Sequence, residues 1–210
     1  DPMGGYDPYS SSKGCADLLA SSYRNSFFNE KDYGTKHQTL LATCRAGNVI
    51  GGGDWAQDRL ICDVMRAAAK NEAVTIRNPH ATRPWQHVLE PLSGYLLVGQ
   101  KLLEGRKEFG GAWNFGPSDD SAIRVLDVLK SAKRYWDKIE FKIGSDTDQP
   151  HEANLLKLDC SKAHALLGWK PVWDSETAFE KTVKWYKNFY ENGTIDTEQN
   201  LNDYVKEMMR

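Results

Sequence analysis

The sequence predicts an α/β fold with a largely parallel sheet, because strand-like and helix-like segments alternate along most of its 210 residues. The strand-like segments are short apolar runs, which are typical of buried parallel strands. The helix-like segments carry apolar side chains at intervals of three and four residues. With a hydrophobic fraction of 40%, a chain of this length can form one large domain, or one domain and part of another.

The elements follow in order from these patterns. Residues 10–29 predict a helix with an apolar stripe, capped by Ser10 or Ser11. The apolar run 40–44 predicts a buried strand, and the glycine-rich segment 45–54 predicts a loop directly after it. The remaining expectations are helices at 58–70, 91–103, 123–136 and 175–191, strands at 74–76, 112–115 and 139–143, a loop over 78–84, a short helix ending at 167–168, and a polar C-terminal tail.

Composition argues against several classes of function. The formal net charge of −2 gives no sign of a nucleic-acid or anionic-membrane partner. No apolar run approaches the ~20 residues needed to span a bilayer, and no signal peptide opens the chain. We expect no metal site. The cysteines are scattered without a CxxC pair, which predicts free thiols in a reducing cytosol: Cys15, Cys44, Cys62 and Cys160.

The segment Tyr9-Ser-Ser-Ser-Lys13 is the first candidate for chemistry. A Tyr and a Lys four residues apart lie one turn from each other on one face of a helix. An ammonium group this close favours the ionised phenol, and a phenolate can accept a proton at physiological pH. The same spacing also occurs on ordinary exposed helices, so the pair alone leaves both interpretations open.

Further motifs follow Tyr9-x-x-x-Lys13 in a fixed order. They are Arg45-x-x-Asn48-Val49-x-Gly51, Arg83-Pro84-Trp85-Gln86-His87-Val88 and Leu167-Gly168-Trp169-Lys170-Pro171. Together these stretches resemble the extended short-chain dehydrogenase/reductase family of nucleotide-sugar enzymes. The segments that are most similar to CDP-glucose 4,6-dehydratases are 45–55, 59–61 and 83–95, and the likeness extends through 151–153 and 158–163 to cover about 1–190.

The resemblance implies the C-terminal part of a Rossmann-type doubly wound parallel sheet and a smaller α/β substrate-binding domain. Residues 1–47 and 85–116 would belong to the NAD-binding domain, and residues 48–84 and 117–210 to the nucleotide-sugar domain. The dinucleotide fingerprint GxGxxG is nowhere in the sequence, and the run 51–53 does not fit its spacing. We therefore expect this glycine-rich half, and the groups for elimination at C5 and C6, to precede residue 1. The chain alone would be inactive.

The resemblance also implies an activity. A whole enzyme would oxidise CDP-glucose at C4 with bound NAD, eliminate water across C5–C6 and return the hydride to C6, yielding CDP-4-keto-6-deoxy-glucose. Tyr9 would take the proton from the C4 hydroxyl, while Lys13 would hold the nicotinamide ribose. Asn48 would contact the nucleotide sugar in a loop whose glycines let the backbone approach a ligand closely. A simple turn residue is the other interpretation of Asn48.

Three arginines lie near successive loops that should face one crevice, where guanidinium groups can bind a diphosphate: Arg59, Arg77 and Arg83. Each could equally be a solvated surface charge. His151 and Glu152 follow a proline in a loop and could reach the substrate or lead into a helix. Several other residues are more typical of a core than of a site: Trp85, His87, Trp185, Tyr186, Phe189 and Tyr190.

The resemblance further implies a cytoplasmic homodimer that supplies deoxysugars for bacterial surface polysaccharide such as the lipopolysaccharide O-antigen. In the family, the Tyr-Lys helix packs against its symmetry mate. The apolar stripe that could serve this contact, or the sheet, consists of Ala16, Leu19, Ala20 and Tyr23. Two other functions stay open: a nucleotide-sugar epimerase or reductase on the same scaffold, and a non-catalytic fragment that binds a nucleotide sugar.

Overall fold

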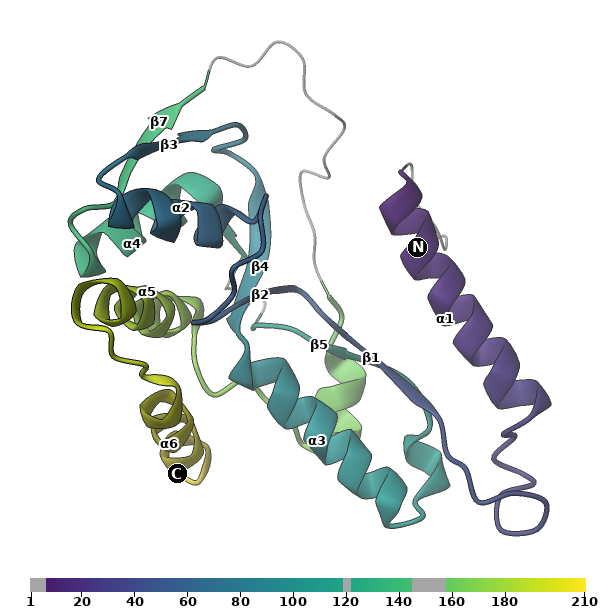
Figure 1. Cartoon of the computed structure of the whole chain (residues 1–210). Coiled ribbons are helices and arrows are strands. Elements are labelled where there is room, and N and C mark those ends of the chain that lie inside the picture. The colour runs from purple at the N-terminus through teal and green to yellow at the C-terminus, as the bar shows by residue number, and fades with distance from the viewer. Residues whose placement is uncertain (1–6, 119–121, 145–157) are drawn as a thin grey trace. The chain divides into compact units, whose positions relative to one another are not determined.

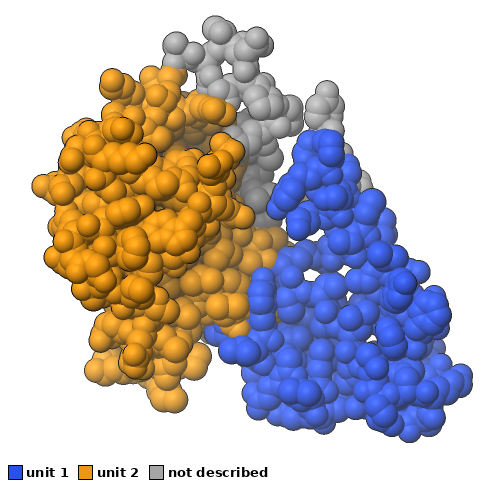
Figure 2. All heavy atoms as spheres, viewed as in Figure 1, with its two compact units in different colours: residues 1–45, 93–114, 161–169 blue, residues 46–92, 115–160, 170–210 orange. Residues whose placement is uncertain are grey.

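The computed structural model describes residues 7–118, 122–144 and 158–210 of the chain (Figure 1). The chain divides into two compact units (Figure 2). Unit 1 comprises Asp1–Arg45, Ser93–Asn114 and Ser161–Trp169, and unit 2 comprises Ala46–Leu92, Phe115–Cys160 and Lys170–Arg210. Helices and short strands alternate in sequence, as the predicted α/β class requires. Among the described helices, none is both long and apolar enough to cross a membrane.

Unit 1 is built around a two-stranded sheet and contains only a small buried core. Its buried apolar side chains include Val98, Phe109 and Trp113. Its elements, three of which extend into unit 2, are α1 (Pro8–Ser26), β1 (Ala42–Ala46), β5 (Gly111–Phe115), the greater part of α3 (Leu89–Leu103), a 3₁₀ turn (Lys107–Phe109) and a π-helical turn (Ala163–Leu167).

The first helix begins two residues earlier than predicted because Asp7 caps it. The Asp7 carboxylate accepts hydrogen bonds from the Ser10 backbone N–H at 2.9 Å and from the Ser10 hydroxyl at 2.7 Å. These bonds lower the pKa of Asp7. A carboxylate is the stronger acceptor and interacts favourably with the positive end of the helix dipole. The prediction that Ser10 or Ser11 is the cap is therefore wrong, since Ser10 donates to Asp7 instead.

In its described residues, unit 2 holds two small sheets and four helices of its own. Strand β2 runs parallel to β4, β4 runs antiparallel to β6, and β3 runs parallel to β7. The element bounds are β2 (Asn48–Ile50), α2 (Leu60–Ala69), β3 (Ala73–Ile76), β4 (Thr82–His87), β6 (Ala122–Arg124), α4 (Val125–Tyr135), β7 (Glu140–Ile143), α5 (Ser175–Asn192) and α6 (Thr197–Met208).

The main hydrophobic core lies in unit 2, where α5 packs against β4, α2 and α4. Trp185 and Tyr186 on α5 are buried, as predicted, and so are Trp85 and His87 on β4. Phe189 is partly buried and packs against this core, whereas Tyr190 is exposed at 36%. It lies near the C-terminal end of α5, where its ring stacks on one side against Trp136 with 6.1 Å between the ring centroids.

Three predictions about the chain's irregular segments are wrong. The segment 45–54 was expected to be a loop but contains strand β2. The segment 78–84 contains two prolines and was expected to be a loop, but β4 begins at Thr82 and pairs with both β2 and β6. The expected polar tail contains the helix α6 instead. Its apolar residues recur at helical spacing, at Leu201, Tyr204, Val205 and Met208, a pattern that the prediction of a polar tail overlooked.

Candidate functional site

Helix α1 carries the Tyr9 and Lys13 side chains in the predicted arrangement. The Lys13 Nζ lies 5.4 Å from the centroid of the Tyr9 ring, one helical turn away on the same face. Tyr9 is 71% exposed, so its hydroxyl is accessible to a substrate. The structure thus places the phenol and the ammonium group side by side on an exposed face of the helix.

Strand β1 holds α1 in place through Arg45, the first residue of the second motif. Its Nε lies 2.9 Å from the Asp17 carboxylate on α1, and its Nη1 donates to the Asn114 side-chain oxygen at 3.3 Å. Arg45 thus links α1, β1 and β5, all within unit 1. This motif arginine has a structural role that the sequence pattern alone did not identify.

In unit 2, Asn48 and Arg83 lie on the neighbouring parallel strands β2 and β4. Asn48 is in register with Trp85, and Arg83 precedes Trp85 by two residues on the same strand. Because register partners and alternate residues share one face of a sheet, Asn48 and Arg83 both lie on the face of Trp85. Arg83 is 8% exposed, and its Nη1 donates to the Thr82 carbonyl at 3.0 Å. The structure therefore brings two of the predicted residues together.

The other two arginines are more exposed. Arg59 is the residue that precedes α2, and its Nε lies 3.7 Å from the Asp54 carboxylate. Arg77 follows β3 and is exposed. Arg59 and Arg77 thus lie at the ends of different elements, α2 and β3. His151 and Glu152 lie outside the described residues.

The glycines on both sides of β2 were expected to let a ligand approach the backbone closely. In the structure, other parts of the protein occupy the space beside them. A Cβ added at Gly52 would lie 2.0 Å from the Cδ2 atom of Trp185, and one at Gly51 would lie 2.8 Å from Val88. A Cβ at Gly47 would lie 2.9 Å from the Pro84 carbonyl oxygen. These positions need glycine because the protein's own side chains and backbone pack there. Asn48, moreover, is the first residue of strand β2 rather than a loop residue.

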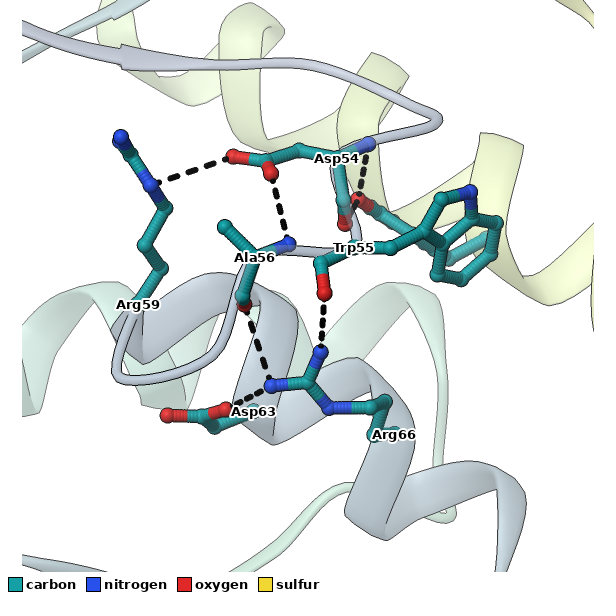
Figure 3. A network of polar contacts seen from close by, with 7 residues as sticks. Asp54, Trp55, Ala56, Arg59, Asp63 and Arg66 are labelled. Atoms are coloured by element: carbon teal, nitrogen blue, oxygen red, sulfur yellow. Dashed lines mark hydrogen bonds and ion pairs between the residues drawn. The ribbon is translucent and has the colours of Figure 1, made fainter.

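A network of polar contacts that sequence reasoning missed holds the segment from Asp54 to Arg59 (Figure 3). The Tyr186 hydroxyl on α5 donates to the Asp54 carbonyl at 2.6 Å and accepts from the Asp54 N–H at 3.0 Å. Arg66 on α2 donates to the carbonyls of Trp55 and Ala56 at 2.8 and 3.2 Å. The sequence indicates this turn only through Asp54 and Trp55, which follow directly after three glycines.

His87 is buried and therefore cannot serve as a positively charged group that binds an anion. Its Nδ1 accepts from the Leu89 N–H at 3.3 Å, and its ring lies edge-on to Trp173 at 4.9 Å between centroids. Desolvation, helped by the charge of Lys181, lowers the pKa of His87 to about 4. The imidazole is therefore neutral at physiological pH, which fits the predicted structural role.

The comparison with protein families decides the classification. The family described as GDP-mannose 4,6 dehydratase matches residues 1–183. The chain belongs to this family. CDP-glucose 4,6-dehydratase of Salmonella typhimurium is 49% identical over 212 residues, which cover 100% of this chain and 59% of that protein. The dTDP-glucose 4,6-dehydratase of Haemophilus influenzae is 24% identical and is matched by 85% of this chain over 51% of its own length.

This member of the GDP-mannose 4,6-dehydratase family thus spans half to three fifths of those two relatives. Its fold matches UDP-glucuronic acid 4-epimerase from Bacillus cereus, solved with UDP-glucuronic acid and NAD, with a TM-score of 0.71 and 19% identity over 90% of this chain and 55% of that one. The dTDP-glucose 4,6-dehydratase from Bacillus anthracis, solved with NAD, gives a TM-score of 0.68 and 21% identity over 91% and 55%. These likenesses confirm the predicted fold class.

Proposed function

We propose that the whole protein is an NAD-dependent CDP-glucose 4,6-dehydratase. It would oxidise the sugar at C4, eliminate water across C5–C6 and return the hydride to C6. The observation that carries this proposal is the exposed Tyr9 with the Lys13 ammonium over its ring, in a chain 49% identical to a protein named for this reaction. Unit 1 would belong to the NAD-binding domain and unit 2 to the nucleotide-sugar domain.

The proposed chemistry of this chain begins with Tyr9. Its phenolate would take the proton from the C4 hydroxyl as the C4–H bond breaks, and the Lys13 ammonium would stabilise the phenolate. Arg83, Arg59 and Arg77 would bind the diphosphate through their guanidinium groups. The Asn48 amide would contact the nucleotide sugar. His151 and Glu152 stay proposals of substrate contact that rest on the resemblance alone.

The residues of α1 fit the nicotinamide end of NAD. Tyr9 and Lys13 present a hydroxyl and an ammonium on an exposed helix face, and these groups can hydrogen-bond to a ribose. When bound, NAD would supply the acceptor for the hydride and later its donor. The sequence contains no glycine-rich dinucleotide fingerprint for its phosphates, so α1 could account for one end of the cofactor only.

We expect Tyr9→Phe to abolish dehydratase activity in a protein that joins this chain to an N-terminal segment like that of its relatives. Removing the general base should lower kcat about 10²–10⁴-fold while the fold is retained. The measurement is formation of the 4-keto product from CDP-glucose, with Tyr33→Phe as the control. Full turnover by the Tyr9→Phe variant would show that Tyr9 is not the base. A 4-epimer that keeps its C6 hydroxyl would indicate an epimerase instead.

We also propose a cytoplasmic homodimer whose product serves deoxysugar synthesis for bacterial surface polysaccharide. The dimer proposal is supported by α1, on which no residue is buried. Large apolar side chains are exposed along it and at its C-cap: Leu18, Leu19, Tyr23 and Phe27. An exposed apolar face of this kind is typical of an interface. Sedimentation of the longer protein at the mass of a monomer would contradict the dimer.

A further inference from the structure

The segment from Asp54 to Arg59 ends in an arginine whose one ion pair among the described residues joins its Nε to Asp54. We propose that Asp54 is a positioning residue that orients Arg59 toward the diphosphate of the nucleotide sugar. This inference rests on the proposed function, in which Arg59 is a diphosphate ligand. Asp54 itself would not touch the ligand, because it acts through the Arg59 guanidinium.

The backbone of Asp54 is fixed at both of its polar groups by a single side chain. The Tyr186 hydroxyl donates to the Asp54 carbonyl at 2.6 Å and accepts from the Asp54 N–H at 3.0 Å. Tyr186 is fully buried on α5, so this hydroxyl belongs to the rigid core of unit 2. Asp54 is thereby attached to a scaffold rather than to a free loop.

The Asp54 side chain is oriented by the turn that follows it. Its Oδ1 accepts from the Ala56 N–H at 3.0 Å, the Asx-type turn that this residue favours. With Oδ1 engaged, Oδ2 is the oxygen that lies 3.7 Å from the Arg59 Nε. Figure 3 shows Arg59 and Trp55 on opposite sides of this turn. Trp55 packs among α5 aromatic side chains, with its ring centroid 5.4 Å from that of Tyr186.

Two arginines border this turn, and their surroundings differ. Arg66 donates to the carbonyls of Trp55 and Ala56 and pairs with Asp63, so it has a structural role. The side chain of Arg59 is 63% exposed and makes a single ion pair among the described residues, through Nε. Its two Nη groups remain available, and together they match the two oxygen atoms of a phosphate group. Arg59 is therefore oriented by Asp54, while its two Nη groups stay free to bind a ligand.

The charge of Asp54 has two opposite effects on a bound diphosphate. It repels the ligand, but this repulsion is weak across solvent because the Asp54 side chain is 40% exposed. It also confines a flexible side chain whose ordering would otherwise weaken binding. We expect the ordering effect to be the larger one. An exposed pair of this kind contributes about a two- to five-fold change in affinity.

The test is a double-mutant cycle on the affinity of the full chain for CDP, measured by titration calorimetry. Asp54→Asn keeps the acceptor for Ala56 but removes the charge that faces Arg59. We expect it to weaken CDP binding about two- to five-fold in the wild-type background and to change nothing in the Arg59→Ala background. Asp127→Asn removes an equal charge from the exposed face of α4 and serves as the control.

The outcomes distinguish the positioning role of Asp54 from the proposed role of Arg59 as a diphosphate ligand. Equal effects of Asp54→Asn with and without Arg59 would mean that Asp54 acts on the fold rather than through Arg59. Unchanged or tighter CDP binding by Asp54→Asn, with weaker binding by Arg59→Ala, would overturn the positioning role and leave Arg59 as a ligand. If Arg59→Ala leaves the affinity for CDP unchanged, or if the unmodified chain does not bind CDP, the positioning role of Asp54 and the role of Arg59 as a ligand are both overturned. Urea midpoints of each variant show whether the fold is intact.

Discussion

Glu90→Ala is expected to destabilise unit 2 by about 3–5 kcal/mol, because it removes a fully buried carboxylate that accepts hydrogen bonds from two backbone N–H groups and a hydroxyl. Glu90 lies at the start of α3 and accepts from the backbone N–H of Trp173 at 2.7 Å and of Val172 at 3.0 Å. It also accepts from the Tyr204 hydroxyl on α6 at 2.9 Å. Burial raises the pKa of Glu90, whereas these hydrogen bonds oppose that rise. Alanine would leave buried donors without an acceptor.

Urea denaturation followed by tryptophan fluorescence measures this effect. Glu90→Gln should recover only part of the stability, because an amide offers one acceptor oxygen and would turn its NH₂ group toward donors. Tyr204→Phe should cost about 1 kcal/mol, since it removes one of the three donors and leaves the carboxylate bound by the backbone. Glu104→Ala, at an exposed position of unit 1, is the control. A midpoint for Glu90→Ala equal to that of the control would refute the role of Glu90.

The same network stabilises α6, which the prediction of a polar tail missed. Its segment Thr197–Met208 is mostly polar, although Leu201, Tyr204, Val205 and Met208 recur at helical spacing. What holds it is tertiary: Tyr204 reaches Glu90, and Glu207 accepts from the indole N–H of Trp173 at 2.9 Å. In the prediction, the mostly polar composition of this segment outweighed the helical spacing of its few apolar residues.

Strand β4 was missed for a related reason. Its motif begins with Arg83-Pro84, and a proline within a short segment favours a loop by the usual local rule. Pairing with β2 on one side and β6 on the other outweighs that preference. Strong local signals were predicted well: α2, α3 and α5 lie within a few residues of their expected positions. The strands β3, β5 and β7 were also predicted within a residue or two, whereas β2 and β4, which pair with each other, were expected to be loops.

The candidate site divides in the same way. The Tyr9 and Lys13 arrangement depends on helical spacing alone, so the sequence was sufficient to predict it. The reason for the glycines after β2 could not be read from the sequence, because a glycine that faces a ligand and one that faces a tryptophan look alike. The contact between Gly52 and Trp185 joins segments far apart in the chain and is visible only in the folded protein.

Gly52→Ala should therefore destabilise unit 2 by about 3 kcal/mol, through overpacking rather than through any lost ligand contact. The added Cβ would lie 2.0 Å from Cδ2 and 2.1 Å from Cγ of Trp185. This indole cannot easily move aside. It is 5% exposed, stacks on Phe189 at 5.5 Å between centroids and donates to the Thr197 hydroxyl at 2.9 Å. The unfolding free energy from urea titration reports the cost.

Two further variants distinguish overpacking from a general intolerance of alanine. Gly99 lies within α3 with no atom within 4 Å of an added Cβ, so Gly99→Ala should be neutral or stabilising by up to about 1 kcal/mol. Trp185→Leu removes the ring atoms that the new methyl group would overlap. The loss of unfolding free energy caused by Gly52→Ala should then fall by more than half in the Trp185→Leu background, because the clash between the new methyl group and the indole is absent there. If Gly52→Ala costs the same in both backgrounds, the contact with Trp185 is not the reason for this glycine, and a ligand close to the backbone becomes the better explanation.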